Sequence, residues 1–142
     1  MSKKWIFVSS LILIFIVMSI SVVSADDNNI VLGEISFKIP SDYDECVDFE
    51  ITNHTKNYGN MTIKESHRTF CNKDGKYLGI TVDEFSKPTS LKDLKINGDE
   101  KTIGSQEGIH SYDDLNFFKF EKDGKIITVS YEDESIIEKV IN

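Results

Sequence analysis

Apolar and polar residues alternate strictly in several short stretches of this chain, which is typical of strands with one buried face. The first of these runs ends at Pro40, a residue that cannot donate to a sheet ladder. These runs together predict a sheet whose apolar face the rest of the domain must cover. The alternating apolar positions are Ile35, Phe37 and Ile39; Val47, Phe49 and Ile51; Leu78, Ile80 and Val82; and Ile127, Val129 and Tyr131.

The last third of the chain, residues 101–142, predicts an antiparallel meander of three short strands closed by a helix. Asp123-Gly124 separates the last two of these strands and suits a type I′ turn, because both central residues of that turn need a positive φ. The sequence Lys-Asp-Gly-Lys occurs at 73–76 and again at 122–125, and both copies predict hairpin tips. A duplicated unit and independent use of the same turn both explain the repeat.

Helices are expected at two places. Leu91–Leu94 follows Thr89 and Ser90, either of which can cap a helix N-terminus. Residues 132–142 begin with acidic side chains and carry a single isoleucine and valine stripe, which predicts an amphipathic closing helix. We therefore predict an α+β fold, with an antiparallel sheet of about five to seven strands and two or so helices packed on it.

Aromatic residues crowd the predicted meander. By strand alternation Phe118 and Phe120 share the inward face, and Phe117 points the other way. Phe117 either packs under a helix on the second face of the sheet or, exposed beside Tyr112, forms a small recognition patch. Of these two interpretations, packing is the expected one.

The N-terminal segment, residues 1–25, predicts a signal peptide. Lys3 and Lys4 precede a long apolar run, and Val23-Ser24-Ala25 offers the small residues that a signal peptidase reads. An uncleaved membrane anchor is the rival interpretation, because the run is long enough to span a bilayer. Under either interpretation, residues 26–33 are expected to form a flexible lead-in and residues 34–142 a single domain outside the cytoplasm.

The charge balance argues against nucleic acid as a partner. All 24 acidic residues follow Ala25 and two of the 16 basic residues precede it, which leaves 14 basic against 24 acidic residues and a formal charge of −10. Binding of nucleic acid requires neutralisation of phosphates. An acidic surface of this kind favours solubility or tolerance of a saline environment.

Two cysteines, Cys46 and Cys71, predict one disulfide in an extracytoplasmic protein. A nucleophilic cysteine assisted by a histidine is the alternative, although neither cysteine lies in a known nucleophile context. Free thiols are the third possibility, in an organism that lacks an oxidising exterior.

Two N-glycosylation sequons lie between the cysteines, at Asn53 and Asn60. The stretch Thr52–Asn60 is polar, and we expect it to form an exposed loop or hairpin end that can carry glycans.

The sequence contains no compact catalytic, cofactor-binding or metal-binding motif. The three histidines lack metal-ligand spacing, and the acidic group near residue 45 lacks the glycine and closing glutamate of a calcium loop. The segment 104–108 resembles the nucleophile motif Gly-x-Ser-x-Gly, but its serine stands one position too early. The residues considered are His54, His67 and His110, together with Asp42, Asp44, Glu45 and Asp48. We therefore predict no catalytic residue, cofactor or metal, although carboxylates that assemble only in three dimensions remain a possible hydrolase site.

The order of short motifs resembles a known group of proteins. Phe37-Lys38-Ile39-Pro40 ends the first strand, 101–108 precedes the phenylalanine-rich strand 117–120, and Ile-Ile-Glu-Lys-Val-Ile closes the chain at 136–141. This layout resembles small exported proteins of methanogenic archaea and is similar to the PsbP-like α/β/α sandwich. The resemblance covers most of 34–142 and departs most at Thr52–Arg68. It implies a fold, an export address and an accessory or assembly role, and it carries no catalytic residues over.

The sequence thus favours a non-catalytic secreted or cell-envelope domain that binds or supports an envelope or extracellular partner. Contact with the membrane would occur only through residues 1–25, if they are not cleaved. The alternative is a small secreted hydrolase acting on envelope sugars or peptides.

Overall fold

An antiparallel sheet dominates the computed structural model, which describes residues 28–46 and 52–142. The predicted leader and the inward positions Val47, Phe49 and Ile51 lie outside the described residues. Within these residues, eight strands form one sheet and two strands form a separate hairpin. The elements are β1 (Asn28–Leu32), β2 (Ile35–Ile39), β3 (Tyr43–Glu45), β4 (Thr52–Tyr58), β5 (Met61–Asn72), β6 (Tyr77–Phe85), β7 (Asp99–Ile103), β8 (Gln106–Asp113), β9 (Leu115–Lys122), β10 (Lys125–Tyr131) and α2 (Ile137–Ile141).

The predicted α+β class is wrong, because the described chain is nearly all β and α2 is five residues long. The helix expected at Leu91–Leu94 is a single turn. Asp93 accepts hydrogen bonds from the backbone N–H (2.8 Å) and the hydroxyl (2.7 Å) of Ser90, and Lys95 follows with a φ of 48°. A residue in the left-handed conformation cannot continue a right-handed helix. The helix predicted from the spacing of Leu91 and Leu94 therefore ends after one turn.

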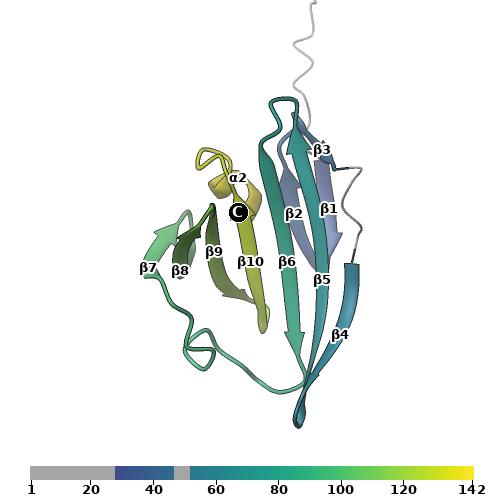
Figure 1. Cartoon of the computed structure of the whole chain (residues 1–142), viewed down its shortest axis with the longest axis vertical. Helices are drawn as coiled ribbons and strands as arrows, with labels where there is room; N and C mark the ends of the chain where they lie inside the picture. Colours follow the sequence, from purple (N-terminus) through teal and green to yellow (C-terminus); the bar gives the residue numbers. More distant parts are fainter. Residues whose placement is uncertain (1–27, 47–51) are drawn as a thin grey trace, which may run out of the picture.

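The large sheet has the order β3-β5-β6-β10-β9-β8-β7, and β4 pairs with the remaining length of β5 (Figure 1). The meander of the last third contains four strands rather than three, because Gly104-Ser105 makes a turn inside the expected first strand. The Asp123-Gly124 turn forms as predicted, with φ values of 52° and 73°. Both Lys-Asp-Gly-Lys copies are hairpin tips, at opposite ends of the sheet because β6 and β10 are antiparallel.

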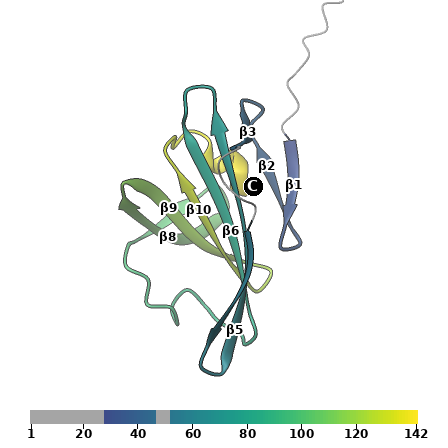
Figure 2. The same ribbon diagram turned by 45° about the vertical axis from the view of Figure 1, so that its right-hand side comes forward.

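One face of this sheet forms the core. The alternating residues of β6 and β10 meet there, with Ile80 opposite Val129, and the predicted inward residues Phe118 and Phe120 join them with 0% exposure. The β1–β2 hairpin and α2 cover this face (Figures 1 and 2). The stripe predicted for the closing helix is buried and consists of Ile136, Ile137, Val140 and Ile141.

Residues 28–32 form strand β1 rather than part of a flexible lead-in. The Gly33-Glu34 turn that follows has positive φ values and is held by Lys125, whose ammonium donates to the Gly33 carbonyl and to the Glu34 carboxylate, both at 2.8 Å. A Cβ at Gly33 would lie 2.7 Å from a methyl of Val82. The hairpin therefore docks directly on the sheet.

The polar stretch Thr52–Asn60, expected to be an exposed loop or hairpin end, consists of strand β4 and the exposed hairpin turn Gly59-Asn60. Each of its described side chains is exposed, so it has no apolar alternation to reveal a strand. Its pairing with β5 runs from Thr52↔His67 to Tyr58↔Met61, and the Lys56 ammonium lies 2.8 Å from the Glu65 carboxylate. Backbone hydrogen bonds, rather than burial, define this strand.

Candidate functional site

The second face of the sheet carries the candidate sites, and we call it the open face. The β1–β2 hairpin and α2 lie on the core side, whereas the connection between β6 and β7, residues 86–98, runs on the other side (Figure 2). Two hydrogen bonds hold the start of the connection against β5. The backbone N–H of Ser86 donates to the Thr62 carbonyl, and the backbone N–H of Thr62 donates to the Ser86 hydroxyl oxygen, each at 2.8 Å. It therefore forms a fixed wall beside the sheet.

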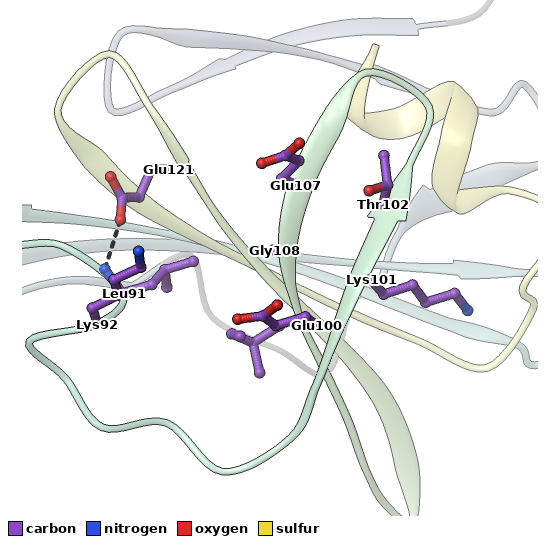
Figure 3. A pocket seen from close by; sticks show the side chains of 9 residues that line it. Leu91, Lys92, Glu100, Lys101, Thr102, Glu107, Gly108 and Glu121 are labelled. Carbon is purple, nitrogen blue, oxygen red and sulfur yellow. Dashed lines mark hydrogen bonds between the residues drawn. The ribbon is translucent and has the colours of Figure 1, made fainter.

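A hollow of about 590 Å³ lies between this connection and strands β7 to β9 (Figure 3). Glu121 fixes its wall, because its carboxylate accepts the backbone N–H of Leu91 at 2.7 Å. Gly108 pairs with Phe120, so Glu107 and Glu121, the next residue on each strand, lie beside each other. The hollow is lined by Leu91, Lys92, Glu100, Lys101, Thr102, Glu107, Gly108, Ile109 and Glu121.

The hollow carries a larger excess of negative charge than a count of its lining residues gives, because one of its two lysines points elsewhere. Lys101 extends away from it, and its ammonium donates to Glu134 at 2.7 Å (Figure 3). Three glutamates then face Lys92, around the apolar side chains of Leu91 and Ile109. Carboxylate oxygens accept hydrogen bonds and donate none when ionised, so the hollow suits a ligand that carries amine or hydroxyl donors.

A second carboxylate pair lies elsewhere on the open face. Glu65 on β5 is the cross-strand partner of Asp83 on β6. Burial raises the pKa of Asp83, and the neighbouring Glu65 carboxylate raises it further. Among the described residues, the buried Oδ1 of Asp83 has no hydrogen-bond partner. Like charges placed directly opposite destabilise a sheet, so this pair costs folding free energy.

The histidines do not form a metal centre. The ring nitrogens of His67 lie 2.8 Å from the Thr81 hydroxyl and 3.1 Å from the Thr69 hydroxyl, and burial lowers the pKa of this imidazole. His110 lies 3.2 Å from the Asn116 side-chain oxygen, and His54 is exposed on β4. In residues 28–46 and 52–142 no group of three histidine, cysteine or acidic side chains has metal-binding geometry.

The disulfide predicted between Cys46 and Cys71 is present, with the two Cα atoms 5.4 Å apart. It fastens the end of β3 to β5 just before the chain continues to β4. Asn53 lies on β4 and Asn60 in the β4–β5 turn, and both are exposed, as an attached glycan requires. Their glycosylation stays a prediction.

The acidic group near residue 45 does not converge on one point. Glu45 forms an ion pair with Arg68 on β5, whereas Asp42 and Asp44 are exposed and Asp48 lies outside the described residues. The segment 104–108 is a hairpin turn entering β8 and not a nucleophile turn.

The hollow and the Glu65–Asp83 pair were not predicted. Their members come from strands far apart in the sequence, and only the strand register brings them together. The one available signal in the sequence was the strand alternation, which places these acidic residues on the face of the sheet opposite to the apolar core residues.

Comparisons of the chain with protein-family models, with curated proteins and with solved structures gave no match. Within the described part of the chain, no helix has the length and apolar character needed to cross a bilayer.

Proposed function

We propose that this protein is a non-catalytic exported domain that binds a small ligand in the hollow, in an accessory role at the cell envelope. The disulfide supports an extracellular address, because disulfides persist in oxidising compartments. The signal-peptide pattern of residues 1–25 and the resemblance to small exported archaeal proteins point the same way.

The hollow is the observation that carries this proposal. Its volume of about 590 Å³ falls within the usual range for small-molecule sites. Glu100 and Glu107 present acceptors beside the apolar Ile109, an arrangement that can hold the polar edge and the apolar side of one small molecule. Amino sugars and small polyamines have this chemistry.

Isothermal titration calorimetry tests the proposal, with glucosamine, N-acetylglucosamine and spermidine as probes. Glu107→Gln should weaken the binding of at least one probe about tenfold, because it replaces a charged acceptor by a neutral one. Glu138→Gln, at an exposed position on α2, is the matched control and should leave the affinity unchanged. Equal affinity of Glu107→Gln and the parent protein for every probe would exclude the hollow as the site.

A small secreted hydrolase is the second candidate function, favoured by the Glu65–Asp83 pair. A carboxyl group with a raised pKa beside a second carboxyl group is the arrangement from which acid and base roles arise. Turnover of envelope sugars or peptides that Asp83→Asn abolishes would establish this activity. Glu84→Gln, at the exposed adjacent position, serves as the control.

A further inference from the structure

Strand β1 is an edge strand without a charged side chain. Proteins commonly place charged residues on edge strands, because the unpaired backbone groups there would otherwise pair with another chain. Within the described residues, each of the other edge strands follows this rule. These strands are β3 with Asp44 and Glu45, β4 with Lys56, and β7 with Asp99, Glu100 and Lys101. Strand β1 lacks the protection that these edges have.

The outer edge of β1 presents free backbone groups. Gly33 and Glu34 have φ values of 54° and 66°, which makes a two-residue turn in which Leu32 and Ile35 form a hydrogen-bonded pair. Such pairs alternate along an antiparallel ladder, so the N–H and C=O groups of Asn29 and Val31 point away from β2. No backbone hydrogen bond to another described residue occupies them. Figure 2 shows β1 as the outer strand of the hairpin, with β2 between it and α2.

The side chains of β1 add apolar contact area at the same edge. Val31 is 66% exposed, and the other large apolar side chains exposed among the described residues are two tyrosines, which carry a polar hydroxyl. Ile30 points to the opposite, inner face and is only partly buried against the core. A strand added at this edge would cover the exposed side of Ile30 and would lie beside Val31. The edge therefore fits an extended, uncharged segment.

A second copy of this chain supplies such a segment. Residues 26–142 carry a formal charge of −10, so two copies repel each other over most of their surfaces. Repulsion is weak at the hairpin, because the carboxylate of its one acidic residue, Glu34, accepts a hydrogen bond from the Lys125 ammonium at 2.8 Å. Antiparallel pairing centred on Ile30 would place Asn29 of each copy opposite Val31 of the other. This register uses every free N–H and C=O group of both edges.

We propose that β1 pairs with β1 of a second copy and joins the two hairpins into one four-stranded layer. The contact is isologous, since the same strand serves both copies and a two-fold axis passes beside Ile30. A five-residue strand gives an interface at the lower end of the usual size range, so the dimer should dissociate on dilution. The hollow lies on the other face of the large sheet, and it stays open in both copies.

Sedimentation velocity of the purified protein, in the form that the cell produces, tests the proposal without any substitution. The average mass should rise with concentration toward that of a dimer. It should also rise with salt concentration, because salt screens the repulsion between two acidic copies. A protein that stays monomeric at about 1 mM, where weak interfaces still associate, would overturn the proposal. A dimer that salt dissociates would be held by ion pairs and would overturn it as well.

Val31→Pro tests the backbone pairing. Proline removes an N–H that the ladder with β2 does not use, and edge strands tolerate it at such positions. Each copy then loses one donor to the other, so the dissociation constant should rise about tenfold or more. Val31→Thr is the matched control, because it retains the N–H and a β-branched side chain, and it should leave the dimer unchanged. Equal dissociation constants for the two variants would contradict the pairing.

Cysteine coupling provides a second measurement, which does not depend on how Val31→Pro folds. The register places Ile30 opposite itself in a non-hydrogen-bonded pair, with the Cα atoms about 4.5 Å apart, which a disulfide can bridge. Ile30→Cys should therefore form a covalent dimer on a non-reducing gel at least about ten times faster than Val31→Cys, which lies opposite Asn29. Random collision would favour position 31, because its side chain is the more exposed. Faster coupling through Val31→Cys would overturn the proposal.

Discussion

Replacing Ile137 by alanine tests how α2 stabilises the sheet. Ile137 is 2% exposed and sits in the stripe that closes the core face. Truncation of a buried isoleucine to alanine costs about 2 to 5 kcal/mol, which includes the lost transfer free energy and the cavity that remains. A helix of five residues cannot form alone in water, so its packing supplies nearly all of its stability. We therefore expect the upper half of this range, a large share of the 5 to 15 kcal/mol typical of a domain.

Urea denaturation monitored by circular dichroism measures this loss, with the disulfide kept oxidised. The midpoint should fall by about 1 to 5 M, because the unfolding free energy of a small domain usually changes by about 1 to 3 kcal/mol per M urea. Glu138→Ala, on the exposed side of the same helix, should cost less than about 1 kcal/mol. If the two variants unfold at the same urea concentration, or if Ile137→Ala costs less than 1 kcal/mol, the helix does not seal the core.

Three other changes probe the disulfide, a buried phenol and the carboxylate pair. Replacing Cys46 and Cys71 by serine should cost about 3 to 4 kcal/mol in urea, from the chain entropy of a 25-residue loop, and no loss would contradict this. Burial raises the pKa of Tyr131 to about 12, so its phenol ionises first in the unfolded state, and the free energy of unfolding should fall as pH rises from about 10 through 12. Tyr131→Phe should reduce the slope of unfolding free energy against pH in this range by the equivalent of one proton. An unchanged slope would refute the assignment. Burial and Glu65 raise the pKa of Asp83, which means that its ionised form destabilises the folded state at pH 7. Asp83→Asn should therefore stabilise the protein at pH 7, and this gain should disappear below about pH 4, where Asp83 is protonated in both states. Destabilisation by Asp83→Asn at pH 7 would contradict this reasoning.

The sequence predicted the centre of the sheet well, because burial there is one-sided. Ile80 and Val129 stand in runs where every second residue is apolar, and such a run has one consistent interpretation. Asp123-Gly124 was equally informative, since few residue pairs accept two positive φ values.

The edges were harder to predict because they contain little apolar pattern. All described side chains of β4 are exposed, and β5 has buried residues on both faces, Ser66 and Phe70 on one and Thr69 on the other, so neither strand shows the alternation of a half-buried strand. Leu91 and Leu94 have helical spacing, yet the Ser90–Asp93 hydrogen bonds close a single turn. The α+β class followed from these helix signals and from the resemblance, and it was wrong for that reason.

The open face could not be predicted for a different reason. The candidate site depends on which strands are neighbours, and Glu107 and Glu121 lie beside each other only because β8 pairs with β9. A sequence gives the face on which each residue lies but not the order of the strands. The disulfide was predictable because two cysteines allow one pairing.

Mapping chemical-shift changes by NMR on the ¹⁵N-labelled protein tests the central claim, that this domain binds a small ligand in the hollow. With glucosamine added, the account predicts changes around Glu107 and Ile109, which line the hollow. Changes confined to the core side, around α2 and the β1–β2 hairpin, or no changes at all, would contradict the account.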